Sequence, residues 1–197
     1  MNRRLIIGLF LCVALAQVGV PLSMILRREL VLTQGAYFKF ETAPVDPYDA
    51  FRGRYVALAI KEDNVPAITD ARLSQGQRVF ALIGLDGRGF AKLTSAVTAR
   101  PRGKDYIQAR VRYVSEGKLY LDLPIDRYYM EEGAAPMAET VYREHVSRDK
   151  QDAYAAVRVK DGFPVIAGLY VGGQKIEDAV RQKATPPKAL YNKQQAP

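Results

Sequence analysis

The sequence has very few of the residues that build metal and redox sites. In 197 residues there is one cysteine, Cys12, and one histidine, His145. Cys12 lies in an apolar run near the amino terminus, so the rest of the chain has no thiol for a disulfide or a thiolate metal site. No second histidine and no carboxylate stand at ligand spacing from His145, which we interpret as a packing residue on a helix. The sequence therefore predicts no metal and no cofactor.

The sequence also lacks a serine nucleophile at the position where signal peptidases carry one. A single anchor followed by a β domain also describes signal peptidases, whose serine lies just before a Gly-Asp strand opening. The matching stretch, residues 41–52 (ETAPVDPYDAFR), contains no serine. Covalent hydrolysis needs a nucleophile beside a base. The glycines of GLDGRG, residues 84–89, lie between two predicted strands and indicate a hairpin rather than a phosphate cradle. We expect a protein that is not an enzyme.

Positive charge is in excess but it is dispersed. The formal net charge is +8 and the pI is near 9.6, with the densest basic cluster in the carboxy-terminal tail. A nucleic-acid surface would show clustered Lys and Arg together with a binding motif. Attraction to anionic lipid is the commoner use of such an excess beside a membrane. We therefore expect no nucleic-acid partner.

One long hydrophobic run opens the chain. Residues 5–26 read LIIGLFLCVALAQVGVPLSMIL without a charge, between Arg3-Arg4 and Arg27-Arg28. As a helix this run would be about 33 Å long, enough for a hydrocarbon core of about 30 Å. The sequence thus predicts a transmembrane helix that contacts the lipid bilayer through residues 5–26.

Two alternatives to a permanent anchor remain open at this stage. Ala14-Leu15-Ala16 fits a signal-peptide cleavage site, although a mature chain would then begin with strongly apolar residues. A lipoprotein is disfavoured because bulky Leu11 precedes Cys12. The flanking charges slightly favour an amino terminus inside the cell. The expected location is the bacterial inner membrane, with a single pass and a periplasmic soluble domain.

Beyond the anchor, strand patterns dominate. Ile107, Ala109, Val111 and Tyr113 alternate with polar residues, as in a half-buried strand, and RVFALIGL at residues 78–85 indicates a central strand. Between the predicted strands, a charged residue followed by glycine indicates a hairpin turn at residues 86–87, 102–103, 116–117 and 161–162. The fold class that we expect is mainly β, an antiparallel meander of about eight strands forming a barrel or sandwich with one inserted helix, after the transmembrane helix.

The inserted helix is expected at residues 135–150, where Met137, Val141 and His145 stand four apart and Pro136 suits the first turn. The tail is rich in Lys, Pro and Gln. Such composition is typical of disorder. The predicted organisation is an anchor at 1–30, a β domain at 31–181 and a disordered tail at 182–197.

The segment that stands out is APVDPYDAFRGRYVALAI, residues 43–60. Asp46-Pro47 suits a turn, and Arg52-Gly53 opens a strand with Val56, Leu58 and Ile60 on one face. A glycine at a strand entrance permits a bulge or a close backbone approach. Arg52 could pair with Asp46, Asp49 or Asp126. The segment is interpreted as a rigid corner of the barrel or as a binding surface.

These residues resemble the GDYXXLXY proteins, an uncharacterised family of bacterial membrane-anchored proteins. The motif falls on Gly53-Arg54-Tyr55-Val56-Ala57-Leu58-Ala59-Ile60, and a second similar block runs from Ile125 to Tyr129 and on to Glu132-Gly133. Arg54 replaces the motif's Asp and Ile60 its final Tyr, which puts in doubt any role that needs that carboxylate. The resemblance implies membrane anchoring, a bacterial source and association with multi-span membrane proteins, and it supplies no activity.

The leading hypothesis is a non-enzymatic accessory or interaction protein of the bacterial envelope. The alternative is an envelope module that binds a small lipid or glycan fragment inside a barrel, and a signal-peptidase-like hydrolase comes third. The candidate binding or motif residues are Asp46, Pro47, Arg52, Gly53, Tyr55, Leu58, Asp126, Arg127, Tyr128, Glu132 and Gly133.

Overall fold

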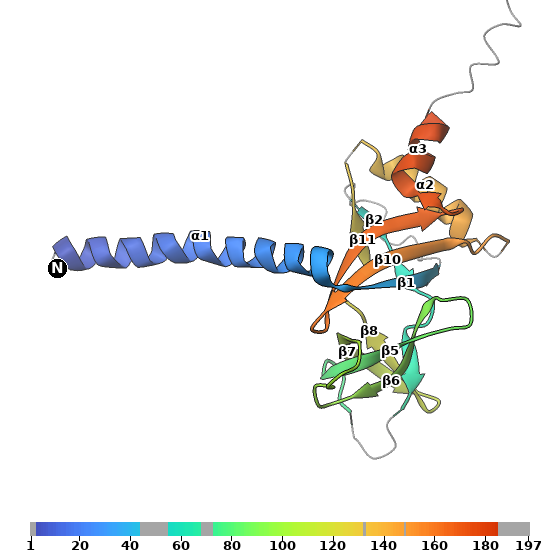
Figure 1. Ribbon diagram of the computed structural model, residues 1–197, viewed down its shortest axis with the longest axis horizontal. Helices are drawn as coiled ribbons and strands as arrows, with labels where there is room; N and C mark the ends of the chain where they lie inside the picture. Colours follow the sequence, from blue (N-terminus) through green and yellow to red (C-terminus); the bar gives the residue numbers. More distant parts are fainter. Residues whose placement is uncertain (1–2, 44–54, 68–72, 132, 148, 185–197) are drawn as a thin grey trace, which may run out of the picture.

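The computed structural model describes residues 3–43, 55–67, 73–131, 133–147 and 149–184. Its first element, α1 (Arg3–Gln34), projects from the β domain as one long rod (Figure 1). The part from Ile6 to Gln34 is long and apolar enough to cross a membrane, and none of its most apolar window is buried against the protein. The helix continues past the end of the predicted apolar run because its last turns pack on the domain, where Val31 is 2% exposed.

The chain passes from α1 into the domain without a linker. The amide of Gly35 donates a 2.8 Å hydrogen bond to the carbonyl of Val31, which closes the last turn of the helix. Arg158 then donates to the carbonyl of Gly35 at 2.9 Å, and Lys160 donates to the side chain of Gln34 at 2.8 Å. These contacts hold the end of α1 against the domain, so the expected boundary at residue 30 falls inside this helix.

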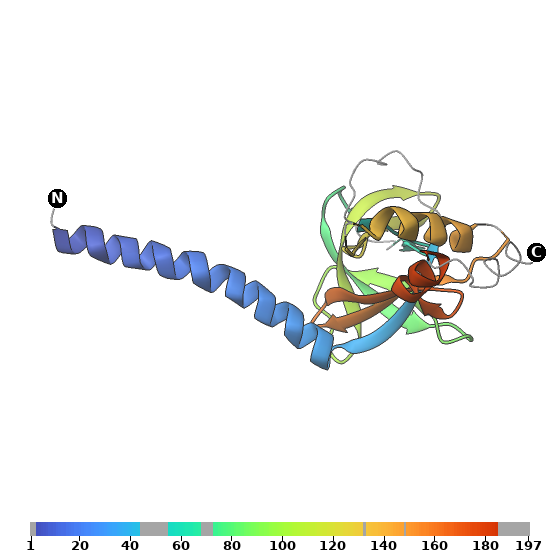
Figure 2. The same ribbon diagram turned by 90° about the horizontal axis from the view of Figure 1, so that it is seen from above.

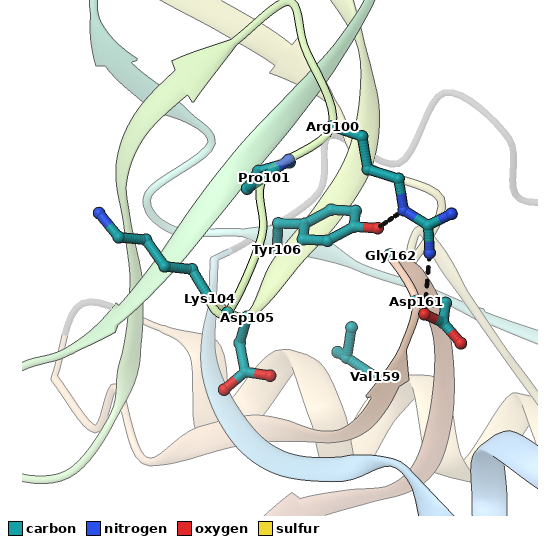
Figure 3. A pocket seen from close by; sticks show the side chains of 9 residues that line it. Arg100, Pro101, Lys104, Asp105, Tyr106, Val159, Asp161 and Gly162 are labelled. Carbon is teal, nitrogen blue, oxygen red and sulfur yellow. Dashed lines mark hydrogen bonds and ion pairs between the residues drawn. The ribbon is translucent and has the colours of Figure 1, made fainter.

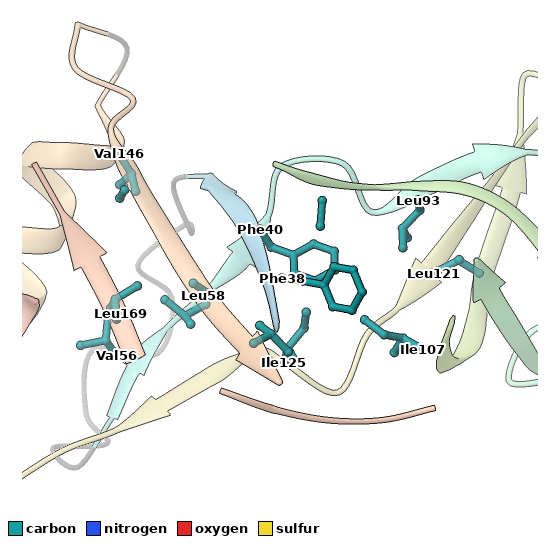
Figure 4. Close-up of a cluster of buried hydrophobic side chains, with 14 of the residues drawn as sticks. Phe38, Phe40, Val56, Leu58, Leu93, Ile107, Leu121, Ile125, Val146 and Leu169 are labelled. Carbon is teal, nitrogen blue, oxygen red and sulfur yellow. The ribbon is translucent and has the colours of Figure 1, made fainter. Parts of the chain in front are cut away.

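The main sheet is antiparallel, with the strand order β12-β11-β10-β1-β3. Strand β1 follows α1 directly and pairs with β10 along most of its length. Its inward side chains, Phe38 and Phe40, are buried and lie between the two halves of the core (Figure 4). The strands of this sheet are β1 (Ala36–Ala43), β3 (Ala59–Ile60), β10 (Ala153–Lys160), β11 (Phe163–Val171) and β12 (Gln174–Lys175).

The barrel sheet has the order β4-β8-β7-β5-β6, and β4 lies against β6, so it nearly closes. Its inward side chains, including Val79, Ile107, Leu119 and Leu121, are fully buried and fill the interior. This packing leaves no support for the hypothesis of a lipid or glycan fragment held inside the barrel. The strands are β4 (Asn64–Pro66), β5 (Arg78–Leu85), β6 (Ala91–Val97), β7 (Tyr106–Ser115) and β8 (Lys118–Asp122).

Two short strands, β2 (Tyr55–Ala57) and β9 (Arg127–Tyr129), form a separate antiparallel ribbon. Helices α2 (Ala135–Val146) and α3 (Ile176–Ala184) pack on each other and on the main sheet. They lie across the main sheet from β5–β8 in Figure 1, and Figure 2 shows α1 joining the domain at one edge.

The predicted fold class is confirmed, with antiparallel sheets, a barrel-like part and the inserted helix. Two hairpin predictions are matched by positive φ at both turn residues, Glu116-Gly117 and Asp161-Gly162. The arrangement is not a simple meander, because β7 pairs with β5 rather than with β6. Helix α3 was not expected and includes residues 182–184 of the predicted tail, whose remainder lies outside the described residues.

One side-chain prediction was wrong in direction, and one predicted helical group is divided. Tyr113 was expected to face inward with Val111, but a register irregularity between these two residues turns it outward, where it stacks on Tyr120. Of the residues that stand four apart on α2, Val141 is buried with Ala138 and Tyr142, whereas Met137 is exposed. Each change leaves the surrounding element intact.

Candidate functional site

The two segments that carry the motif lie side by side. In the β2–β9 ribbon Tyr55 is opposite Tyr129, Val56 is opposite Tyr128, and Ala57 is opposite Arg127. Because side chains alternate between the faces of a strand, one face of the ribbon carries Val56 and Tyr128 and the other carries Tyr55, Arg127 and Tyr129. The two motif blocks therefore meet at one place through their described residues, Tyr55–Ala57 and Arg127–Tyr129.

The inner face of the ribbon belongs to the core. Val56 and Leu58 are buried, and the amide of Leu58 donates a 2.8 Å hydrogen bond to the carbonyl of Asp126. Immediately afterwards β3 leaves β9 and pairs with Thr42 and Ala43 of β1. The motif strand thus joins the ribbon to the main sheet, which is the structural role expected of a rigid corner.

Tyr128 connects the same face to α3. Its hydroxyl donates a 2.5 Å hydrogen bond to Oε1 of Glu177, in the first turn of the helix. Burial, and then the hydrogen bond to this carboxylate, raise the pKa of Tyr128 well above its usual range. Oε2 of Glu177 is buried and has no hydrogen-bond partner among the described residues. The phenol therefore stays protonated and acts as a donor rather than as an acid or base.

The outer face, which we call the ribbon face, consists of Tyr55, Arg127 and Tyr129. The two tyrosine rings lie 5.7 Å apart between centroids, and the guanidinium of Arg127 lies 5.3 Å above the ring of Tyr55. Tyr129 is 60% exposed. Asp126 forms a 3.3 Å ion pair with Arg127. Tyr and Arg are the residues most enriched among the dominant contacts of protein interfaces.

A groove of about 360 Å³ adjoins the ribbon face and reaches the end of α1. Arg127 and Tyr129 form one side, Arg28 of α1 contributes a second, and Phe163 and its neighbours on β11 contribute a third. The ribbon face therefore lies close to the point where α1 enters the domain.

A second polar depression, of about 320 Å³, lies where the β10–β11 hairpin meets the loop before β7 (Figure 3). Arg100 donates to the hydroxyl of Tyr106 at 2.7 Å and forms a 2.8 Å ion pair with Asp161. The ring of Tyr106 lies directly over Gly162, which has a φ of +77°. The hydroxyl and the carboxylate are both engaged by Arg100, so this arrangement locks the hairpin to the barrel sheet.

Several predicted residues cannot be placed. Asp46, Pro47, Arg52, Gly53 and Glu132 lie outside the described residues. The pairing proposed for Arg52 is therefore untested. Gly133 is exposed in the turn before α2.

Within the described residues, no group of three His, Cys, Asp or Glu side chains could hold a metal ion. His145 lies 2.7 Å from Asp152 through Nδ1, and the amide of Asp152 donates to the carbonyl of His145 at 3.1 Å. This pair closes the loop after α2. The partner of His145 was not predicted, because Asp152 is brought back to the helix only by the loop.

Sequence reasoning missed three residues of this site: Tyr129, Glu177 and Arg28. The apolar–polar alternation through Arg127 and Tyr128 could have indicated that Tyr129 faces outward. Glu177 and Arg28 come from α3 and α1, and no local signal connects either helix to β9. Their place in the site follows from tertiary packing alone.

Comparison with known proteins supports this identification of the motif. Neither the curated proteins nor the solved structures contain a match to this chain. A family model described as "GDYXXLXY protein" matches residues 17–169, which cover most of the chain, from the second half of α1 to β11. The chain belongs to the GDYXXLXY protein family.

Proposed function

We propose that this protein is a non-enzymatic accessory protein, anchored in the bacterial inner membrane by α1, whose ribbon face binds an integral membrane protein beside it. The observation that carries the proposal is the groove shared by Arg28 of α1 and by Arg127 and Tyr129 of the ribbon face. A partner in the same membrane could contact the anchor and the ribbon face together.

The chemistry of the ribbon face suits a protein contact better than a reaction. Its groups are the exposed ring of Tyr129, the half-buried ring of Tyr55 and the exposed guanidinium of Arg127, held by ring packing and by Asp126. Tyrosine rings give large contact areas at small cost in conformational entropy, and an arginine already held by a ring contact and an ion pair loses less freedom on binding than a free one. Among the described residues of the site, no nucleophile has a base beside it, which supports the non-enzymatic part of the proposal.

The junction between α1 and the domain also supports this proposal. Hydrogen bonds from Arg158 and Lys160 and the burial of Val31 fix the domain relative to the helix. A fixed domain presents the ribbon face at a constant height and direction above the bilayer. A domain fixed in this way can meet a membrane partner in one orientation, whereas a domain on a flexible linker would sample many.

The test is photo-crosslinking in native membranes. A photoreactive amino acid replaces Tyr129, and the control replaces Tyr113, a 48% exposed tyrosine on β7. We expect one multi-span protein crosslinked from position 129 and not from 113, and we expect Arg127→Ala to weaken its co-purification in mild detergent. Equal crosslinking from both positions, or none from 129 in membranes that retain the intact chain, would contradict the proposal.

A further inference from the structure

A third groove lies between the end of α1 and the barrel sheet, and it shares Asp126 and Phe163 with the groove beside the ribbon face. It has a volume of about 460 Å³. Arg27 of α1 and Arg110 of β7 contribute its basic side chains, and Phe163 and Pro164 of β11 form an apolar wall. We infer that this groove binds the phosphate headgroup of an anionic phospholipid.

The charges around the groove leave it positive. Its two acidic residues are already paired with arginines, Asp122 with Arg112 at 2.6 Å and Asp126 with Arg127 at 3.3 Å. Among the described residues no carboxylate pairs with Arg27 or with Arg110. The groove therefore has two positive charges that no described carboxylate neutralises.

Both arginines are held in place by contacts that leave donors free. The guanidinium of Arg27 lies 4.5 Å above the ring of Phe163, a cation–π contact that uses no N–H group. Arg110 donates through one amino nitrogen to the carbonyl of Gly76 at 3.1 Å, and no other described residue accepts from its remaining nitrogens. Guanidinium groups bind phosphate oxygens through two parallel hydrogen bonds, so these side chains suit a phosphodiester.

The position of the groove selects lipid as the source of that phosphate. Arg27 is the first charged residue after the uncharged run of residues 5–26, so it lies at the headgroup level if α1 spans the bilayer. Phe163, near the tip of the β10–β11 hairpin, is 38% exposed beside it. An exposed apolar ring beside basic side chains is the combination with which interfacial surfaces bind the boundary between headgroups and acyl chains. The inference rests on the anchoring role of α1 in the proposed function but not on the protein partner.

The test uses the purified full-length protein in nanodiscs with equal amounts of phosphatidylglycerol and phosphatidylcholine, followed by native mass spectrometry of the lipids retained. The variants are Arg27→Gln and Arg110→Gln. The matched control is Arg28→Gln, which removes the same charge at the adjacent position of α1, in the wall of the other groove. We expect the wild type to retain phosphatidylglycerol preferentially. Each groove variant should lower that retention by at least about tenfold, because it removes charge-assisted hydrogen bonds to the phosphate. Arg28→Gln should lower it by no more than about fivefold, the general attraction of one surface charge to anionic lipid.

Three outcomes would overturn the inference: equal retention of the two lipids by the wild type, equal losses in Arg27→Gln and Arg28→Gln, or full occupancy of the groove by soluble glycerol phosphate in lipid-free detergent. The last result would identify a free phosphate ligand.

Circular dichroism confirms the fold of each variant, and Arg110→Gln provides a second test within the β domain. The intact mass reports whether α1 is still attached, so failure of the anchor is distinguished from failure of the lipid site.

Discussion

The hydroxyl of Tyr128 donates its hydrogen bond to a carboxylate, Glu177, that belongs to a different element and has a second buried oxygen without a partner among the described residues. This single bond ties β9, and with it the ribbon face, to the first turn of α3. The geometry of the proposed contact surface therefore depends on a helix that contributes nothing to that surface.

Tyr128→Phe should lower the free energy of unfolding by about 1–3 kcal/mol, because it leaves the partly buried carboxylate of Glu177 without its donor. The measurement is denaturant unfolding of the full-length protein in detergent. The control is Tyr120→Phe on β8, whose ring stacks on Tyr113 and whose hydroxyl has no hydrogen bond within the described part of the chain.

Replacing both partners, in Tyr128→Phe with Glu177→Leu, should recover part of the loss, since no polar group then stays buried alone. If Tyr128→Phe unfolds with the same midpoint as Tyr120→Phe, the hydrogen bond contributes nothing and α3 is held by its apolar contacts only.

Alkaline pH should destabilise the protein through Tyr142. Burial raises the pKa of Tyr142 to about 12, above the value near 10 of an exposed phenol. The unfolded chain therefore loses this proton first. The protonated phenol of Tyr142 thus contributes on the order of 2 kcal/mol to the free energy of unfolding below pH 10. This contribution disappears as the pH rises from 10 toward 12.

Unfolding midpoints of wild type and Tyr142→Phe, compared at pH 8 and pH 11, measure this effect. The variant should lose less stability over that interval, while the lysines and the other tyrosines titrate equally in both proteins. Parallel losses in the two proteins would show that the phenol of Tyr142 titrates as it does in the unfolded chain.

The contact of Tyr106 with Gly162, which holds the β10–β11 hairpin against the barrel sheet, predicts that two similar glycines differ in the stability cost of substitution. Gly162 and Gly117 both have positive φ, +77° and +71°, at the second position of their hairpin turns. A Cβ on Gly162 would overlap the ring of Tyr106, whereas one on Gly117 would meet no atom within 4 Å.

Gly117→Ala should cost about 1 kcal/mol for the backbone conformation alone. Gly162→Ala should cost about 1–3 kcal/mol more, because the buried Tyr106 must move. Thermal unfolding of both variants checks this ordering. Equal shifts in melting temperature would contradict it and would mean that the ring of Tyr106 moves aside without a cost in stability.

The junction of α1 with the domain predicts a rigid relation between them. A Cβ on Gly35 would lie 3.1 Å from both the amide nitrogen and the carbonyl oxygen of Val159, and nearer still to the carbonyl of Val31. These are backbone atoms that cannot rotate away. Gly35→Ala should therefore disturb the junction and broaden the range of angles between helix and domain.

Spin-label distances in nanodiscs measure that range, with one label on the native Cys12 of α1 and another on Thr140→Cys of α2. The matched control is Gly19→Ala, inside α1, where an added methyl meets nothing within 4 Å. A narrow distribution should persist in the control and broaden in Gly35→Ala. A broad distribution in the wild type would contradict the rigid junction.

The sequence alone determined the elements whose signals are local. The uncharged run of residues 5–26 is sufficient for a long apolar helix, because helix formation requires only neighbouring residues. The turns at Glu116-Gly117 and Asp161-Gly162 were predictable because both residues of such a turn need positive φ, which restricts the residue types. Strand alternation likewise identified the buried positions of β7 up to Val111.

Tertiary structure decided the features that depend on distant residues. The irregularity after Val111 reverses the direction of Tyr113, and nothing in the alternation of residues marks it. The pairing of β2 with β9 joins segments far apart in the chain, and only packing brings Glu177 and Arg28 to them. The motif residues were therefore recognisable from sequence, whereas the surface that they form depends on long-range contacts, because a strand's partner is chosen by the whole core and not by its own residues.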